Sequence, residues 1–390
     1  MKAKKLKLFG LSLSQIKKTY SINYEVLSGL KKYFPAGEAS VEFFLNQIMP
    51  HVKNKTIKAY YDHLKLSLIF KENEINIAKI SALILCASLY NDEKIKKYAA
   101  EILKDALDNN FFKNALYNTS SPHDHLFITE CFAIAQHLYP DDALKAGLLK
   151  MLSVLKWLQT PEKSLPHLII TPHMRAFEYH VSDEDRIAFL FSIFHPLTSA
   201  YKQEDSGIII EKYDGHMILN HNNAEAKMMN SLIWRKKKAF LKSFTLSLHS
   251  PALKTHLPLH HHVYDKNNIV VFDSASALEN DVLERRIILL FKDSSNILII
   301  EMLQSQERQA YKAVLTFDAL ADIQKVFFDQ DVDINLSQDQ EYTLTGITQA
   351  GYTFLTIHIG EKYNLTFDKA QVYINNLTLD FQCIPARFID

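Results

Sequence analysis

Residues 121–168 read SPHDHLFITECFAIAQHLYPDDALKAGLLKMLSVLKWLQTPEKSLPHL and predict two helices with a sharp break between them. The helices are expected over residues 124–138 and 141–159. Pro140 separates them and Pro161 ends the second, because proline lacks an amide hydrogen and its ring clashes with the preceding helical turn. Helix after helix across a short link is typical of paired antiparallel helices, so this stretch decides the class of the first half of the chain.

Helical patterns extend on both sides of this stretch. Residues 93–108 place apolar side chains at steps of three and four, which puts them on one face of a helix. Residues 78–90, AKISALILCASLY, are apolar almost all round and predict a helix inside a helical assembly. A last helix is expected over residues 183–201, with Ser182 as its N-cap and acidic residues in its first turn. We therefore predict a helical first domain over residues 1–203.

The hydrophobic pattern changes from the helical to the strand period in the middle of the chain. Residues 207–213 and 216–221 flank Asp214 and Gly215, two turn residues that tolerate positive φ, and so predict a hairpin. Further alternating runs are found at residues 240–248, 297–303, 309–317 and 352–358. Strands that follow helices, rather than alternate with them, predict a separate β domain over residues 204–390.

The composition excludes several classes of function. Lys plus Arg and Asp plus Glu both number 44, so the net charge is zero and gives no overall attraction to nucleic acid. The chain has 9 glycines and contains neither GxGxxG nor a GxxxxGK motif, which excludes dinucleotide and P-loop folds. Cys86, Cys131 and Cys383 lie too far apart to imply a disulfide framework, and the first two are predicted to be buried thiols.

The sequence also predicts where the protein is found. The opening MKAKKLKLFGLSLS is basic, but its apolar run of about six residues is shorter than a secretory signal requires. No stretch approaches the roughly 18 apolar residues of a membrane-spanning helix. We therefore expect a soluble cytoplasmic protein, with the periplasm as the alternative location.

Several blocks, taken in order along the chain, resemble the heparinase II/III-like polysaccharide lyases. The SPHDH that opens the stretch quoted above is similar to the family's S-P-x-Y-H, and TPEKSLP is similar to a family turn of the form T-P-x-x-x-L-P. The other blocks are the apolar helix at 78–90, the strand start SGIII at 206–210 and the strands at 283–323. The resemblance covers residues 55–325, and it implies an incomplete α/α toroid followed by an antiparallel β-sandwich.

The resemblance implies β-elimination from an anionic, uronate-containing polysaccharide or oligosaccharide. Such a lyase must neutralise the substrate carboxylate, remove the C5 proton and protonate the leaving oxygen. The family's proton-transfer Tyr corresponds here to Asp124, a carboxylate that would repel a uronate. His125 keeps the family's His and His123 is a second imidazole, so both are catalytic candidates. In the alternative interpretation Asp124 caps the helix and both histidines are solvated.

Two asparagines are candidates for binding the substrate carboxylate. The family has an Asn-His pair before its apolar helix, and Glu74 and Ile75 stand at those positions. Asn73 and Asn76 flank them and are predicted to bind substrate, with plain surface polarity as the alternative.

The His-rich segment THLPLHHHVYDKNNIVVFDS resembles the family's H-x-H-x-D-D segment and the strand after it. His256 matches the first His, a catalytic candidate, whereas Pro258 replaces the second and cannot bind a metal. Asp273 matches the Asp at the end of the strand. His260 and His262 alternate, so on a strand they would share a face and could bind a divalent metal such as zinc together with Asp273.

Two further features complete the candidate site. Tyr264 is the nearby phenol suited to proton transfer, with a half-buried strand tyrosine as the alternative, whereas a polar His-rich loop is the alternative to a metal site at His260 and His262. Arg235 opens the basic run RKKK directly after Trp234. This run is either a solvated turn or a site that attracts an anionic glycan, with Arg235 binding the chain and Trp234 stacking on a sugar face.

Three functions remain open from the sequence. The protein is a lyase that acts by β-elimination, a glycan-binding protein derived from a lyase that has lost turnover, or a structural protein that inherited the fold. The lyase hypothesis predicts that residues 121–125 and 255–273 face each other across one groove, since pockets commonly form where domains meet.

Overall fold

The structure, a computed structural model, describes residues 77–111, 121–166 and 182–195, and the strands with some of their turns between residues 208 and 380. Isolated described positions are Lys58, Tyr61, Asp62, Leu64, Lys65, Leu116, Tyr117 and Leu168. The chain forms two compact units, residues 1–159 with 163–206 and residues 207–390 with 160–162. The described helices lie in the first unit and the described strands in the second, which confirms the predicted order of helices before strands.

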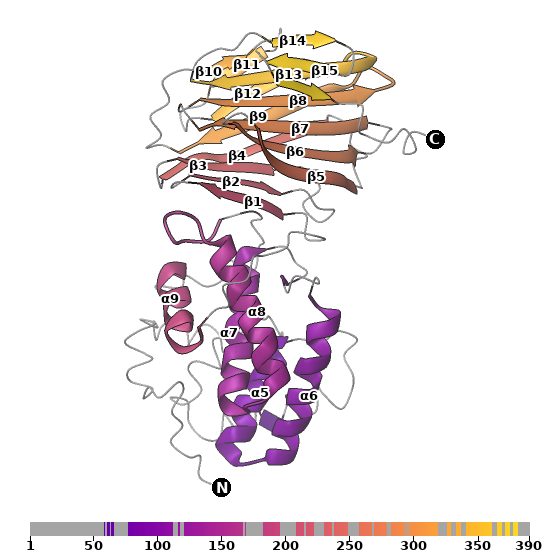
Figure 1. The fold of residues 1–390 in the computed structure, drawn as a ribbon. Helices are drawn as coiled ribbons and strands as arrows, with labels where there is room; N and C mark the ends of the chain where they lie inside the picture. Colours follow the sequence, from indigo (N-terminus) through magenta and orange to yellow (C-terminus); the bar gives the residue numbers. More distant parts are fainter. Residues whose placement is uncertain are drawn as a thin grey trace. The chain divides into compact units, whose positions relative to one another are not determined.

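The described helices of the first unit pack in antiparallel neighbours (Figure 1). They are α5 (Ile77–Tyr90), α6 (Glu93–Asn109), α7 (Pro122–Leu138), α8 (Asp142–Leu158) and α9 (Asp183–Ile193). α5 packs against α6 and α7, and its Ser81 donates a 3.0 Å hydrogen bond to the Cys131 carbonyl of α7. Cys86 and Cys131 are buried thiols, as predicted. Among the described helices, none is long and apolar enough to cross a membrane.

The last described helix is shorter than predicted. α9 ends at Ile193 rather than at residue 201, and Phe194 at its C-cap has an extended backbone. Pro196 follows two residues later and disfavours the helical conformation for His195. The prediction extended the helix past this proline and was wrong for that reason.

The second unit consists of antiparallel strands in three sheets (Figure 1). The strands are β1 (Ile208–Tyr213), β2 (His216–His221), β3 (Asn230–Arg235), β4 (Lys238–Leu248), β5 (Leu257–Lys266), β6 (Ile269–Leu278), β7 (Val282–Phe291), β8 (Ile297–Ser305), β9 (Ala310–Phe317), β10 (Val326–Phe328), β11 (Asp333–Leu336), β12 (Glu341–Ile347), β13 (Gly351–Ile359), β14 (Leu365–Asp368), β15 (Gln371–Ile374) and β16 (Leu377–Asp380). Their orders are β1-β2-β3-β4-β9-β12-β11, β10-β13-β8-β7-β6-β5 and β14-β15-β16. The predicted hairpin is confirmed, because β1 and β2 pair with Tyr213 opposite His216.

The two larger sheets share one hydrophobic core. Phe244 and Leu315 from the seven-stranded sheet and Phe272 and Ile288 from the six-stranded sheet belong to the same buried cluster. The opposite face of β7 belongs to a second cluster, against which Leu365 of β14 packs. β7 is therefore covered on both faces, which explains why it has no alternation of apolar and polar residues.

One fully buried ionic cluster interrupts the shared core. It consists of Glu284 and Arg286 on β7 and Glu301 on β8, and we call it the Arg286 cluster. Arg286 Nε donates to Glu301 Oε2 at 2.6 Å, and Nη2 donates to Glu284 Oε1 at 3.3 Å. Nη1 reaches the other sheet and donates to Ser231 Oγ at 3.0 Å and to the Phe244 carbonyl at 2.8 Å. One guanidinium thus connects both sheets.

Burial decides the protonation of the Arg286 cluster. Burial raises the pKa of Glu284 well above its ordinary value, and the neighbouring Glu301 charge raises it further. A protonated Glu284 that donates its hydrogen bond to Glu301 leaves a single carboxylate opposite Arg286, so the cluster carries no net charge. Because the folded-state pKa is raised, the contribution of Glu284 to stability is complete below pH 4.5 and is lost as the pH rises through the folded value.

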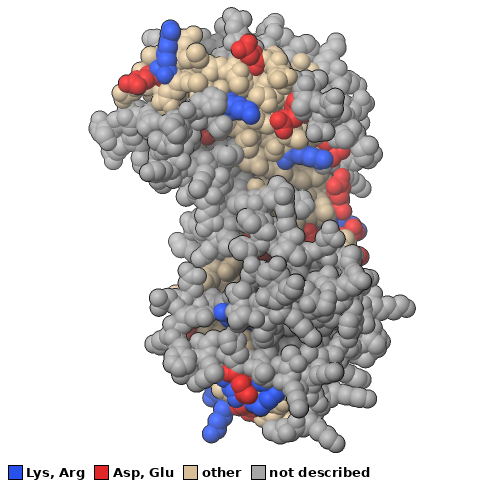
Figure 2. All heavy atoms as spheres, turned by 180° about the vertical axis from the view of Figure 1, so that it is seen from behind, with Lys and Arg blue, Asp and Glu red and all other residues tan. Residues whose placement is uncertain are grey.

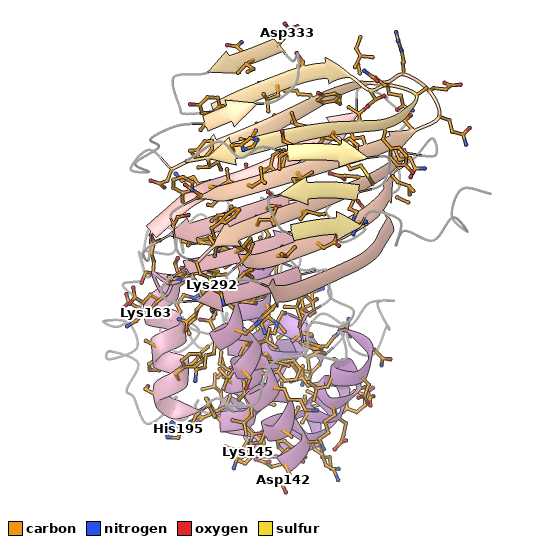
Figure 3. All side chains as sticks on the ribbon, turned by 45° about the horizontal axis from the view of Figure 1, so that its top comes forward. Asp142, Lys145, Lys163, His195, Lys292 and Asp333 are labelled. Carbon is orange, nitrogen blue, oxygen red and sulfur yellow. The ribbon has the colours of Figure 1, made fainter. Side chains whose placement is uncertain are left out.

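Charged side chains of both signs are interspersed on the described surface. Figure 2 shows no continuous patch of one sign on the described part of the face that it presents. Asp142 and Lys145 in the first turns of α8, and His195 after α9, point away from the helices (Figure 3). This mixture agrees with the balanced composition and gives no basic patch to the described part of that face.

Candidate functional site

A serine–proline pair shapes the candidate segment at the start of α7. Ser121 is the N-cap, since its Oγ accepts a hydrogen bond from the Asp124 amide at 3.3 Å. Pro122 fits the first turn, where no amide hydrogen is needed. The alternative in which Asp124 caps the helix is therefore wrong. Asp124 lies in the first turn instead, where the helix dipole favours a negative charge.

His125 is a core residue with both ring nitrogens engaged. Its Nδ1 accepts a hydrogen bond from the Tyr117 amide at 3.2 Å, so Nε2 carries the proton and donates to the Met151 carbonyl at 3.1 Å. The side chain is fully buried, and burial lowers its pKa from 6.5 to about 4. The alternative of a solvated His125 is wrong, and a neutral imidazole held by two main-chain groups is poorly placed to exchange protons with a substrate.

We expect acid to destabilise the helical unit through His125. Its folded-state pKa is lowered, so its contribution is complete above about pH 6.5 and is lost as the pH falls toward 4, by up to about 3 kcal/mol. The substitution His125→Gln should cost about 1–3 kcal/mol at pH 7, because buried main-chain groups lose partners, and should flatten this pH dependence. Urea unfolding at pH 7, 6 and 5 measures both effects. Equal acid sensitivity of the variant and the wild type would contradict the assignment.

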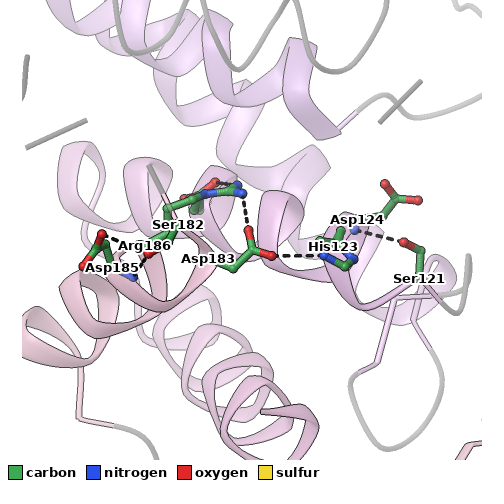
Figure 4. Close-up of polar contacts among 8 residues, drawn as sticks. Ser121, His123, Asp124, Ser182, Asp183, Asp185 and Arg186 are labelled. Atoms are coloured by element: carbon green, nitrogen blue, oxygen red, sulfur yellow. Dashed lines mark hydrogen bonds and ion pairs between the residues drawn. The ribbon is translucent and has the colours of Figure 1, made fainter. Parts of the chain in front are cut away.

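Four titratable side chains connect α7 to α9, and we call them the α7–α9 ion network (Figure 4). Arg186 makes a two-bond contact with Glu130, from Nε to Oε1 at 2.9 Å and from Nη2 to Oε2 at 2.6 Å. Its Nη1 donates to Asp183 Oδ1 at 3.1 Å. The other oxygen of Asp183, Oδ2, lies 3.0 Å from His123 Nε2, an ion pair by distance rather than an aligned hydrogen bond.

The α7–α9 ion network runs from the interior toward the surface. The side chains of Arg186 and Glu130 are 6% and 4% exposed, whereas those of His123 and Asp183 are 13% and 21% exposed. Burial raises the pKa of Glu130, and the Arg186 guanidinium partly offsets this. The buried pair thus fixes Asp183, and Asp183 holds the more accessible His123.

Local sequence explains why Asp183 is where it is. Ser182 caps α9 as predicted, because its Oγ accepts from the Asp185 amide at 3.2 Å. This cap puts Asp183 at the first helical position, and Arg186 follows one turn later. The sequence reasoning missed Asp183, Arg186 and Glu130. The available signal was Glu130 itself, a single charge inside the apolar run ITECFAIA, because a buried charge requires a partner.

In the strand unit, the candidate metal ligand Asp273 is held by arginine. Arg285 Nε donates to its Oδ1 at 2.8 Å and Nη2 donates to its Oδ2 at 2.6 Å. A metal ion at Asp273 would have to displace this guanidinium. Among the described residues, no group of His, Cys, Asp and Glu is placed to hold a metal ion. The described surroundings of Asp273 therefore do not fit one.

The other candidates from the His-rich segment lie on the edge strand β5. His260, His262 and Tyr264 belong to this strand, so the alternative of a loop is wrong for the two histidines. The register places His262 directly opposite Asp273 of β6. The side chains of these three β5 residues lie outside what the structure describes. Wholly outside the described residues are Asn73, Asn76 and His256, so their roles stay predictions.

Trp234 and Arg235 end β3. The Trp234 side chain is 6% exposed, and its residue pairs with Met217 and Ala239 on the neighbouring strands. A buried indole presents little ring surface to a sugar. Arg235 pairs with Lys238 of β4, which places the start of the basic run at a strand end.

Comparison with solved structures identifies the fold. A heparinase III structure aligns with a TM-score of 0.60 at 11% identity, covering 87% of this chain and 73% of that one. A second heparinase III structure gives 0.61 at 10% identity, covering 97% and 79%. A heparan sulfate lyase mutant from Pedobacter heparinus gives 0.55 at 10% identity, covering 94% and 78%. No protein-family model and no curated protein matches the sequence. The predicted resemblance is thereby confirmed as a likeness of fold.

Proposed function

We propose that the protein binds an anionic, uronate-containing polysaccharide and cleaves it by β-elimination. Its fold would be an incomplete α/α toroid followed by an antiparallel β-sandwich. The observation that carries this proposal is the likeness to heparinase III structures, which extends over 87% to 97% of the chain and so includes helices and strands alike. Since one fold can host many functions, the side chains at α7 must also supply the chemistry.

The start of α7 offers one imidazole for this chemistry. His125 is locked in the core, and Asp124 replaces the phenol that the resemblance assigns to proton transfer. His123 remains partly exposed beside Asp183. Loss of a proton-transfer group commonly lowers a rate by about 10²–10⁴, so we expect turnover well below that of an ordinary lyase.

A glycan-binding protein without turnover is the second candidate. It is favoured by the same two observations, Asp124 at the phenol position and His125 bonded to main-chain groups on both nitrogens. In this case the fold would keep its affinity for the polysaccharide while the elimination step is lost.

The deciding experiment measures binding and cleavage side by side on heparan sulfate, hyaluronan, alginate and polygalacturonate. We expect slow formation of unsaturated, ultraviolet-absorbing product from one of them. Asp124→Tyr should raise the rate, because a phenol is restored, and His256→Ala should abolish it. Asp142→Tyr, at the exposed first turn of α8, is the matched control and should change nothing. Binding without product supports the second candidate, and neither binding nor product contradicts both.

A further inference from the structure

We propose that the strand unit carries a second polysaccharide-binding site, where Tyr352 of β13 stacks on a sugar ring and Gln304 of β8 bonds its hydroxyl groups. We call Tyr352, Gln304 and the neighbouring Phe354 the β13 platform. The inference rests on the proposed function, because it takes the ligand to be a polysaccharide. It adds a surface to which none of the candidate site residues belongs, and it applies with or without the elimination step.

The three residues of the β13 platform share the outer face of the six-stranded sheet. Leu355 and Ile357 of β13 belong to the core shared with the seven-stranded sheet, whereas Phe354 packs against the second cluster on the opposite face. Successive side chains of a strand alternate between faces, so Tyr352 lies on the same face as Phe354. Gln304 is the residue directly opposite Tyr352 on β8, which puts these two side chains next to each other.

Tyr352 is an exposed aromatic side chain with an anchored neighbour. It is 41% exposed, and its ring centre lies 6.4 Å from that of Phe354 with 26° between the two ring planes. Phe354 is partly buried and pairs with the buried Met302 of β8. A ring beside such an anchor presents its apolar surface with little conformational entropy to lose on binding.

The backbone beside the β13 platform is fixed by hydrogen bonds between two turns. The Gln309 amide donates to Thr348 Oγ1 at 2.8 Å, and the Thr348 amide donates to the Gln309 carbonyl at 2.7 Å. The Gln349 amide donates at 2.8 Å to Oγ1 of Thr353, the residue after Tyr352. The exposure of Tyr352 therefore belongs to an ordered strand end and not to a frayed one.

The size and polarity of this surface fit a sugar ring better than a protein partner. Among the described residues, the exposed large hydrophobic side chains are Tyr98, Ile334, Ile347 and Tyr352. The first three lie on α6, β11 and β12, so of this set only Tyr352 lies on the outer face of the six-stranded sheet. One exposed ring is far smaller than the roughly 800 Å² that each partner buries in a stable protein complex.

The chemistry of a pyranose matches the two exposed groups of the β13 platform. A pyranose has apolar C–H groups on its faces and hydroxyl groups around its rim. The Tyr352 ring offers an apolar face, and the Gln304 amide offers both donors and an acceptor. Neither contact is ionic, so the affinity that this site adds should persist at high salt, which screens exposed charges.

The experiment measures binding of the full chain to heparan sulfate, hyaluronan, alginate and polygalacturonate by calorimetry, at low and at high salt. Tyr352→Ala should raise the Kd of the polysaccharide that binds by about tenfold at both salt concentrations, because the ring surface is lost. Tyr352→Phe keeps the ring and should stay within about twofold of the wild type. Gln304→Met keeps the size, removes the amide and should raise Kd by about threefold.

Tyr98→Ala is the matched control, because Tyr98 is 54% exposed on α6 in the other unit. It should bind each polysaccharide as the wild type does. Thermal unfolding shows that each variant is folded, and sedimentation gives its oligomeric state. A wild-type dimer that Tyr352→Ala breaks would make this surface an interface between copies of the chain and would overturn the inference.

Failure of this inference and failure of the proposed function give different results. If the wild type binds a polysaccharide and folded Tyr352→Ala binds it equally tightly, then the second site is wrong and the proposed function stands. A loss seen only at low salt, or one that Tyr98→Ala shares, also overturns the second site. Binding that depends on Tyr352 without any cleavage supports the inference and leaves the glycan-binding candidate in place of the lyase. A wild type that binds none of the four contradicts both.

Discussion

Methionine in place of Arg286 should lower the free energy of unfolding by about 3–5 kcal/mol, because breaking a buried ion pair leaves an uncompensated charge. Arg286 is fully buried and bonds to Glu301, Ser231 and the Phe244 carbonyl. Its guanidinium also lies 3.9 Å from the centre of the Phe244 ring. The substitution removes all of these contacts and leaves two carboxyl groups in the core.

Urea unfolding followed by circular dichroism at pH 7 measures this loss. Arg308→Met is the matched control, because Arg308 is exposed after β8 and should change the free energy by no more than about 0.5 kcal/mol. Arg286→Lys should not rescue the fold, since one ammonium group cannot reproduce the planar set of donors. A loss below about 1 kcal/mol for Arg286→Met would mean that water reaches the cluster.

The second large effect is expected in the helical unit. Arg186→Met should cost about 3–5 kcal/mol, because the Glu130 carboxyl would stay in the core without its partner. The double substitution Glu130→Leu with Arg186→Met should recover most of this loss, since an apolar pair of similar volume is often tolerated. Lys145→Met, at an exposed position of α8, should be close to neutral.

The recovery in the double variant is the informative result for Arg186. If the single and double variants were equally unstable, then the loss would come from the packing of the arginine stem rather than from the unpaired Glu130. Thermal unfolding of the four proteins in this cycle separates the two causes.

Elements with a clear local signal were predicted well from the sequence. The helix expected over residues 93–108 is α6, Glu93–Asn109, and the hairpin around Asp214 and Gly215 is β1 and β2. In α6 the buried side chains follow the helical period, and the hairpin is located by its two turn residues. The end of α9 was missed because a proline beyond the pattern decided it.

In strands that are buried on both faces, the sequence pattern does not show which side chains face which neighbour. β7 reads VLERRIILLF, and nothing local shows that Arg286 faces the shared core while Arg285 pairs with Asp273. Their different surroundings depend on strands β3, β4, β6 and β8. The local sequence does not predict where these strands lie relative to β7. The sequence therefore could not predict that the charged residues of β7 form a buried cluster.

The contacts of the candidate residues could not be predicted from the sequence. His123 and His125 are neighbours in sequence, yet one lies in the core and the other beside Asp183, far along the chain. Their surroundings differ because the two residues point to different sides of helix α7. From the sequence, Asp183 was predicted only as a residue in the first turn of a helix. Its contact with His123 forms only when α7 and α9 pack together.

The Arg286 cluster also constrains how this protein can drift over generations. A mutation at position 284, 286 or 301 alone leaves an unpaired charge or polar group in the core, so most single substitutions there should destabilise the fold. Three apolar residues of matching volume would fill the core as well. However, the variants with only one or two of these substitutions would be unstable. The three positions should therefore be inherited as a block and covary across descendants, while the apolar residues around them exchange freely.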